Sequence, residues 1–198
     1  ASSNDGIQFG AVTLGSATII NTNATNTDGD ITFGAITGGS NALTLSTGHN
    51  IANANITVSG AISGLGNLTL ANVGGTTSFA GAISAAAFSA DNTVFNISFA
   101  GASASGNNYT FSGAANFAND GTLTFGNESA DNFTFNGGLT TSSVAGTVTL
   151  VSSNFSSSDD ALTFGAVTLG NNVTIDTNST TTNRADITIG AVTGGNNT

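Results

Sequence analysis

Residues 30–37 read Asp-Ile-Thr-Phe-Gly-Ala-Ile-Thr, and the centre of this stretch is the apolar–Thr–apolar triplet Ile31-Thr32-Phe33. Strict alternation of apolar and polar residues, with β-branched and aromatic side chains, is typical of a β-strand with one buried face. The Gly-Ala pair that follows lets the chain bend after a large inward residue and then offer a second inward Ile. The stretch therefore predicts two short strands joined at a sharp corner.

The same triplet, with Ser or Thr in the middle, recurs along most of the chain at intervals of about 12 residues. Its copies begin at Ile31, Leu43, Ile56, Leu68, Ile97, Tyr109, Leu123, Phe133, Val148, Leu162, Val173 and Ile187. Gly-Gly, Asn-Gly and Asp-Gly pairs, which favour turns, separate many of them. No segment has a helical period of 3.6, and the 27 glycines weaken any helix. The sequence therefore predicts an all-β protein with Gly/Asn-rich turns.

A much longer repeat contains these short units. Residues 9–14, Phe-Gly-Ala-Val-Thr-Leu, return as residues 164–169, and residues 30–41 align with residues 186–197. The offset is 155 residues between Phe9 and Phe164, and it grows by one further along the chain. Self-similarity of this kind is the signature of a repeat architecture.

Two all-β architectures compete for this pattern. A closed antiparallel barrel or sandwich would use many short strands with polar turns, whereas a solenoid would stack nearly identical coils. Near-identity of the successive strands favours the solenoid, a parallel β-helix. With two short units per coil, a coil has about 24 residues and the chain has roughly eight coils, which span about 38 Å at ~4.8 Å per coil.

We interpret residues 1–159 as one long solenoid repeat and residues 160–198 as the start of a second copy, so the chain is expected to be a piece of a longer array. About six coils per long repeat predict an axial repeat of about 30 Å.

Composition excludes several classes of function. Arg184 is the only basic residue against eleven acidic ones, and the formal net charge is -10. Cys is absent, so disulfides, thiol catalysis and Cys-based metal sites are excluded. One Arg cannot neutralise a phosphate backbone, so nucleic acid is not an expected partner. Charged residues are only 6% of the chain, which suits stacked rows of side chains because like charges in register would repel.

No apolar run reaches the ~18 residues of a membrane span, so no transmembrane segment is expected. The lack of Cys, Lys and nearly all Arg disfavours a typical cytosolic enzyme. We therefore expect an extracellular location, either secreted or on a cell surface.

Candidate chemistry is sparse. His49 is the only imidazole and lies in a predicted turn, and the adjacent pair Asp159-Asp160 lacks the basic residues that act on acidic sugars. We predict no catalytic residue and no organic cofactor. Calcium is the one metal considered, because Asp side chains at turns supply oxygen ligands. The candidate ligands are Asp5, Asp28, Asp30, Asp159, Asp160 and Asp186. Thr-x-Thr triplets, which could form a flat hydroxyl face, do not occur once per coil.

The run from an Ile-Thr-Phe triplet through Gly-Ala to Val/Ile-Thr, with its Asn/Gly-rich turns, resembles the β-strand-repeat adhesins of bacteria, including filamentous-haemagglutinin-like proteins and autotransporter passengers. The resemblance covers nearly the whole chain. It implies secretion, a right-handed parallel β-helix and a role in attachment or in an extracellular fibre. It transfers no catalytic residue, because these proteins have no fixed catalytic motif.

The leading prediction is a structural or adhesive module of a long extracellular repeat protein that forms a surface fibre or filament, without catalytic chemistry. Its expected partner is itself, through end-to-end stacking of coils or lateral association. The alternative is a stalk or binding module that recognises a glycan or a cell-surface partner. Residues 85–105 depart most from the repeat pattern and are the expected place for such a binding feature.

Overall fold

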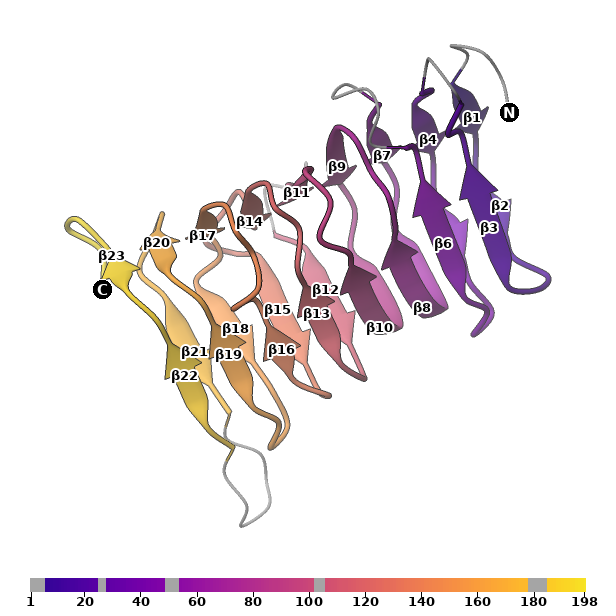
Figure 1. The fold of residues 1–198 in the computed structure, drawn as a ribbon. Helices are drawn as coiled ribbons and strands as arrows, with labels where there is room; N and C mark the ends of the chain where they lie inside the picture. The colour runs from indigo at the N-terminus through magenta and orange to yellow at the C-terminus, as the bar shows by residue number, and fades with distance from the viewer. Residues whose placement is uncertain (1–5, 25–27, 49–53, 102–105, 178–184) are drawn as a thin grey trace.

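The computed structural model describes residues 6–24, 28–48, 54–101, 106–177 and 185–198. Within these ranges the chain forms only β-strands and their connections, which wind into one elongated solenoid (Figure 1). All of the strand pairs are parallel. The predicted parallel β-solenoid is therefore confirmed, and the antiparallel barrel is excluded.

Each coil has three faces, and face 1 is a nine-stranded sheet. Its strands, in order, are β1 (Ile7–Phe9), β4 (Ile31–Phe33), β7 (Ile56–Val58), β9 (Thr76–Phe79), β11 (Asn96–Phe99), β14 (Leu123–Phe125), β17 (Val148–Leu150), β20 (Val167–Leu169) and β23 (Val192–Thr193).

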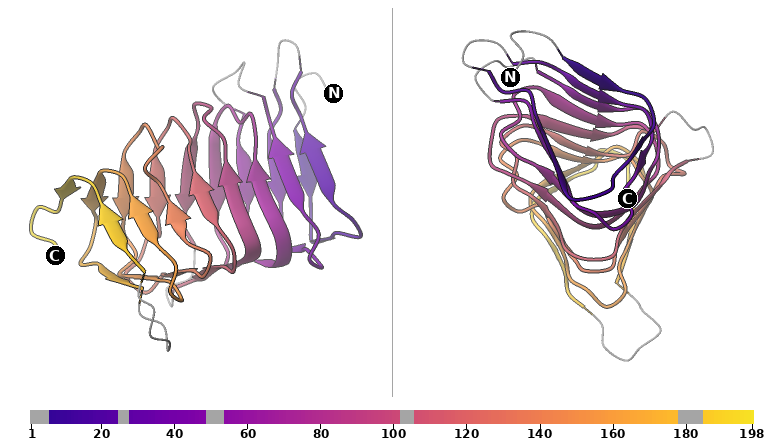
Figure 2. Two further views of the ribbon diagram at one scale, coloured as in Figure 1. Left: turned by 60° about the horizontal axis from the view of Figure 1, so that its bottom comes forward. Right: turned by 90° about the vertical axis from the view of Figure 1, so that its right-hand side faces the viewer.

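Faces 2 and 3 share a 14-stranded sheet because β8 (Ile62–Leu70) and β10 (Ile83–Ala90) run across both faces. Face 2 also contains β2 (Val12–Thr13), β5 (Ile36–Thr37), β12 (Asn108–Phe111), β15 (Asn132–Phe135), β18 (Asn154–Ser156) and β21 (Thr174–Asp176). Face 3 also contains β3 (Thr18–Asn21), β6 (Leu43–Ser46), β13 (Ala115–Phe117), β16 (Leu139–Thr140), β19 (Leu162–Phe164) and β22 (Ile187–Ile189). The right panel of Figure 2 shows the coils enclosing a single interior.

The interior is filled by the two apolar residues of each triplet. Ile31 and Phe33 of β4 are at most 1% exposed, whereas Thr32 between them lies on the outside. Equivalent rings stack along the axis: the ring centroids of Phe99 are 5.3 Å from Phe79 and 5.6 Å from Phe125. Because each coil buries the inward side chains of its neighbours, the triplet is both the strand signal and the core.

The length of a turn varies while the strands stay in register. Ile7 pairs with Ile31, 24 residues later, but Val148 pairs with Val167, only 19 residues later. The predicted coil of about 24 residues is therefore close to the observed turn. The corner connections absorb the difference in length, so the inward positions remain aligned.

The two copies of the long repeat lie on different faces of the solenoid. Phe9 ends β1 on face 1, whereas its equivalent Phe164 ends β19 on face 3. Because β8 and β10 each cover two faces, β19 comes twenty faces after β1, which is six and two-thirds turns. The estimate of six coils and about 30 Å is therefore wrong. The repeat advances about 32 Å at ~4.8 Å per turn and shifts by one face.

A corner hydrogen bond moves with the sequence. The Thr22 hydroxyl donates to the Gly29 carbonyl between faces 3 and 1. Its equivalent in the second copy, Thr177, donates to the Ala185 carbonyl (2.9 Å) between faces 2 and 3. The same local sequence thus makes the same corner at two positions around the axis, so local sequence rather than the face determines the corner.

One inward position of face 1 is polar. The aligned inward residues are Ile7, Ile31, Ile56, Thr77, Ile97, Leu123, Val148, Val167 and Val192. Thr77 is 0% exposed, and its hydroxyl has no hydrogen-bond partner. A buried hydroxyl without a partner costs about 1–3 kcal/mol of stability.

We therefore predict that Thr77→Val raises the free energy of unfolding by about 1–3 kcal/mol, because Val has nearly the same shape and no unsatisfied hydroxyl. Urea unfolding followed by circular dichroism measures the change. Thr57→Val, at an outward position of the same face, is the matched control and should change stability by less than ~0.5 kcal/mol. A less stable Thr77→Val protein would contradict the prediction.

Candidate functional surfaces

The first two calcium candidates act as acceptors for backbone groups at corners. Asp30 Oδ1 accepts the backbone N–H of Asn55 in the next coil at 2.7 Å. Asp28 is 8% exposed, and its Oδ1 accepts the backbone N–H of Ala24 at 3.2 Å. Each carboxylate therefore stabilises a turn of the solenoid.

The other described candidates lie at the corner between faces 2 and 3. Asp159 has a positive φ of 66°, which is a turn conformation. The backbone carbonyl of Asp160 accepts the Ser157 hydroxyl at 2.6 Å, and that of Asp186 accepts the Leu162 N–H at 3.1 Å. Among the described residues, no three His, Cys, Asp or Glu side chains gather as a metal site. The calcium hypothesis thus gains no structural support.

Three other residues considered in the sequence, Asp5, His49 and Arg184, lie outside the described residues. Residues 85–101 do not form the irregular feature that was expected of residues 85–105, and residues 102–105 are not described. Most of this stretch belongs to β10 and β11 in regular positions of the stack, with Phe95 buried between them. The Ala-rich sequence lacks the triplet because β10 continues across a corner.

Sequence reasoning missed a buried carboxylate, Asp131, before β15. It is 0% exposed, and its oxygens accept the backbone N–H groups of Asn107 (2.7 Å), Asn127 (3.0 Å) and Glu128 (3.3 Å). Such hydrogen bonds satisfy a buried carboxylate and hold two neighbouring coils together at one corner. No local signal distinguishes this Asp from the exposed ones, because its donors include a residue 24 positions earlier.

Tyr109 lies next to this corner and is the only Tyr in the chain. Its ring is 0% exposed and stacks on Phe133 with centroids 4.5 Å apart. Burial raises the pKa of the Tyr109 phenol far above its ordinary value, and the negative charge of Asp131 raises this pKa further. Both groups are structural, because they point into the solenoid.

The outer surface presents aligned hydroxyl groups, one per strand. The row on face 1 consists of Thr32, Thr57, Ser78, Ser98, Thr124, Thr149, Thr168 and Thr193. A similar row on face 3 consists of Thr44, Thr69, Ser89, Asn116, Thr140, Thr163 and Thr188. Counting Thr-x-Thr triplets missed these rows, because only the middle residue of each triplet has to be polar.

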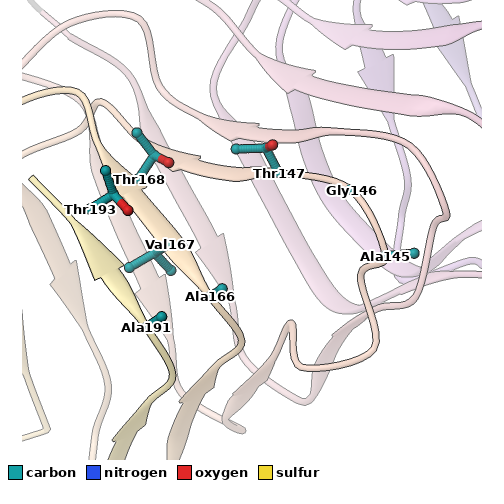
Figure 3. Close-up of a pocket in the computed structure, with 8 residues that line it drawn as sticks. All are labelled: Ala145, Gly146, Thr147, Ala166, Val167, Thr168, Ala191 and Thr193. Atoms are coloured by element: carbon teal, nitrogen blue, oxygen red, sulfur yellow. The ribbon is translucent and has the colours of Figure 1, made fainter.

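Two shallow grooves run beside these rows. Figure 3 shows the groove of about 290 Å³ on face 1, where Ala166 and Ala191 precede the inward apolar residues. Another groove of about 220 Å³, beside Gly138 and Ala161, lies on face 3. Twelve of the thirteen Phe rings are buried, so the grooves lack exposed aromatic rings for stacking against a ligand.

The ends of the stack expose the core. Ile187, Ile189 and Val192 of the last coil are 43%, 38% and 53% exposed, although their positions face the interior elsewhere in the stack. Ile7 and Phe9 of the first coil are only partly buried. Each end therefore combines apolar side chains with the open hydrogen-bonding edges of its last strands.

These features define a parallel β-solenoid repeat protein whose open surfaces are its two ends. No protein-family model, curated protein or solved structure matches the chain. The described residues include no helix that is long and apolar enough to span a membrane.

We predict that the protein loses stability above about pH 10, because only the unfolded state then ionises Tyr109 readily. The raised pKa of the folded state means that this contribution is complete below pH 10. As pH rises towards the folded pKa, it falls by at most about 1.4 kcal/mol per pH unit. Urea unfolding at increasing pH measures the loss, and Tyr109→Phe should abolish it. Folded protein whose tyrosinate absorbance rises near pH 10 would contradict the prediction.

Proposed function

We propose that the chain is a structural or adhesive module of a long extracellular repeat protein that forms a surface fibre or filament. The observation that carries the proposal is the pair of open ends: a one-dimensional stack buries its core everywhere except in its terminal coils. Residues such as Val148 are 1% exposed inside the stack, whereas the aligned Val192 is 53% exposed at its end. Growth along the axis buries such residues.

The lateral surface supports association through the ends rather than through the sides. Its outward rows are neutral hydroxyls, and the formal net charge of -10 makes side-by-side contact between copies repulsive. The buried carboxylate Asp131 and the corner carboxylate Asp30 are already bound to backbone donors, which leaves them unsuited to acid–base catalysis. A mechanical role uses the features that the solenoid has in every coil.

A stalk or binding module is the second candidate, and the grooves beside Ala166 and Gly138 favour it. A glycan or another extended polymer could lie along a groove and form hydrogen bonds with the neighbouring hydroxyl row. Sugar rings usually bind with the help of aromatic side chains, and those of this chain point inward. The grooves therefore support a weak, distributed attachment more than one specific site.

We predict that the 198-residue chain forms thin fibres whose assembly depends on the end residues. Val192→Asp should raise the concentration at which fibres appear by about tenfold or more, because stacking would bury an unpaired carboxylate. Electron microscopy and sedimentation measure assembly.

Val94→Asp adds the same charge at a corner position that is 69% exposed, and it should leave this concentration nearly unchanged. A chain that stays monomeric at every concentration would overturn the proposed function. Equal effects of the two substitutions would show that assembly does not use the ends.

A further inference from the structure

The two ends of the solenoid are steps, because a single chain winds around the axis. The free edge at the N-terminal end consists of β1, β2 and β3, and the free edge at the C-terminal end consists of β21, β22 and β23. Both the first strand, β1, and the last strand, β23, lie on face 1. After β23 the chain turns towards face 2, where the Thr198 carbonyl accepts the Val173 N–H at 2.7 Å. The next strand position to be filled is therefore on face 2, above β21.

We propose that a second copy of this chain stacks its N-terminal edge on the C-terminal edge of the first, rotated by one face, with β1 on β21, β2 on β22 and β3 on β23. This inference rests on the proposed fibre. Without rotation, β1 would lie on β23, and the strand positions above β21 and β22 would stay empty. With β1 on β22, the position above β21 would stay empty. Only rotation by one face joins the two steps without a gap.

The side chains suit this register. Placing β2 on β22 sets Val12 on Ile187 and Thr13 on Thr188, so the inward apolar column and the outward hydroxyl row both continue. Placing β1 on β21 sets the Gln8 amide, a hydrogen-bond donor, beside the Asp176 carboxylate. Apolar side chains and open edges are then covered on every face.

The chain itself contains a precedent for changing faces. The strands β19, β20 and β21 repeat the sequence of β1, β2 and β3, and they stack on β16, β17 and β18. There the equivalent of Val12, which is Val167, lies on Val148 and is 4% exposed. The N-terminal coil sequence therefore packs on a preceding coil although each strand occupies a face other than its original one.

The rotation defines the symmetry of the fibre. From β1 to β23 the chain fills twenty-five faces, which is eight and one-third turns. Each copy then rises about 40 Å, at ~4.8 Å per turn, and rotates by a third of a turn. The same face returns after three copies, about 120 Å along the axis. Stacking without rotation would instead repeat with every copy.

Disulfide trapping tests the register, because the chain has no Cys of its own. Paired residues on adjacent parallel strands are ~4.8 Å apart, within the Cα range for a disulfide. The test variant is the double substitution Gln8→Cys with Asp176→Cys. Two matched variants combine Gln8→Cys with Thr188→Cys or with Thr193→Cys, the outward positions of β22 and β23.

The proposed stacking predicts a ladder of disulfide-linked oligomers for the Gln8 and Asp176 pair, formed roughly tenfold more efficiently than for either matched pair. Cross-links within one molecule are excluded, because the two ends lie about 40 Å apart. The ladder should disappear on reduction, and the single substitutions should give no more than disulfide-linked dimers. Helical reconstruction of unmodified fibres should give the same rise and rotation.

The outcomes separate this inference from the proposed function. Fibres with a stronger ladder for Thr188 or Thr193, or with no ladder at all, overturn the one-face rotation and leave the fibre standing. The absence of fibres in the unmodified chain and in all variants overturns both.

Discussion

In-register parallel stacking is the constraint on which this molecule depends. Backbone hydrogen bonds run along the axis, so each strand must match the length and alternation of the strands on both sides. The chain keeps that register while its turns range from 19 residues, between Val148 and Val167, to 24 residues, between Ile7 and Ile31. Variation is confined to the corners, where buried hydroxyls such as that of Thr22 and buried carboxylates such as that of Asp131 hold the connections.

The same constraint explains the surface. Any outward residue lies ~4.8 Å from its equivalents in the coils on either side, so rows of charge would repel and rows of hydroxyls are tolerated. Several Asp residues lie instead at corners, where Asp30 accepts a backbone N–H of the next coil. The result is a neutral lateral surface and two ends that no other coil of the chain covers.

The three faces are interchangeable to a degree that the sequence repeat reveals. The equivalents of β1 and β4 lie on face 3, as β19 and β22, and they form the same kind of strand there. This is possible because the triplet requires only an interior on one side and solvent on the other. A long repeat of six and two-thirds turns thus presents each of its features on a new face.

The sequence by itself determined the strands, their inward and outward residues, the parallel stack and the approximate length of a turn, because alternation and repetition are local properties of the chain. Only the tertiary structure decided which face each strand occupies, since that depends on the sum of all preceding corners. It also placed Thr77 inside and Asp131 in contact with Asn107, contacts that join different coils. The end surfaces belong to this second kind, because an inward residue is exposed there only when no further coil lies above it.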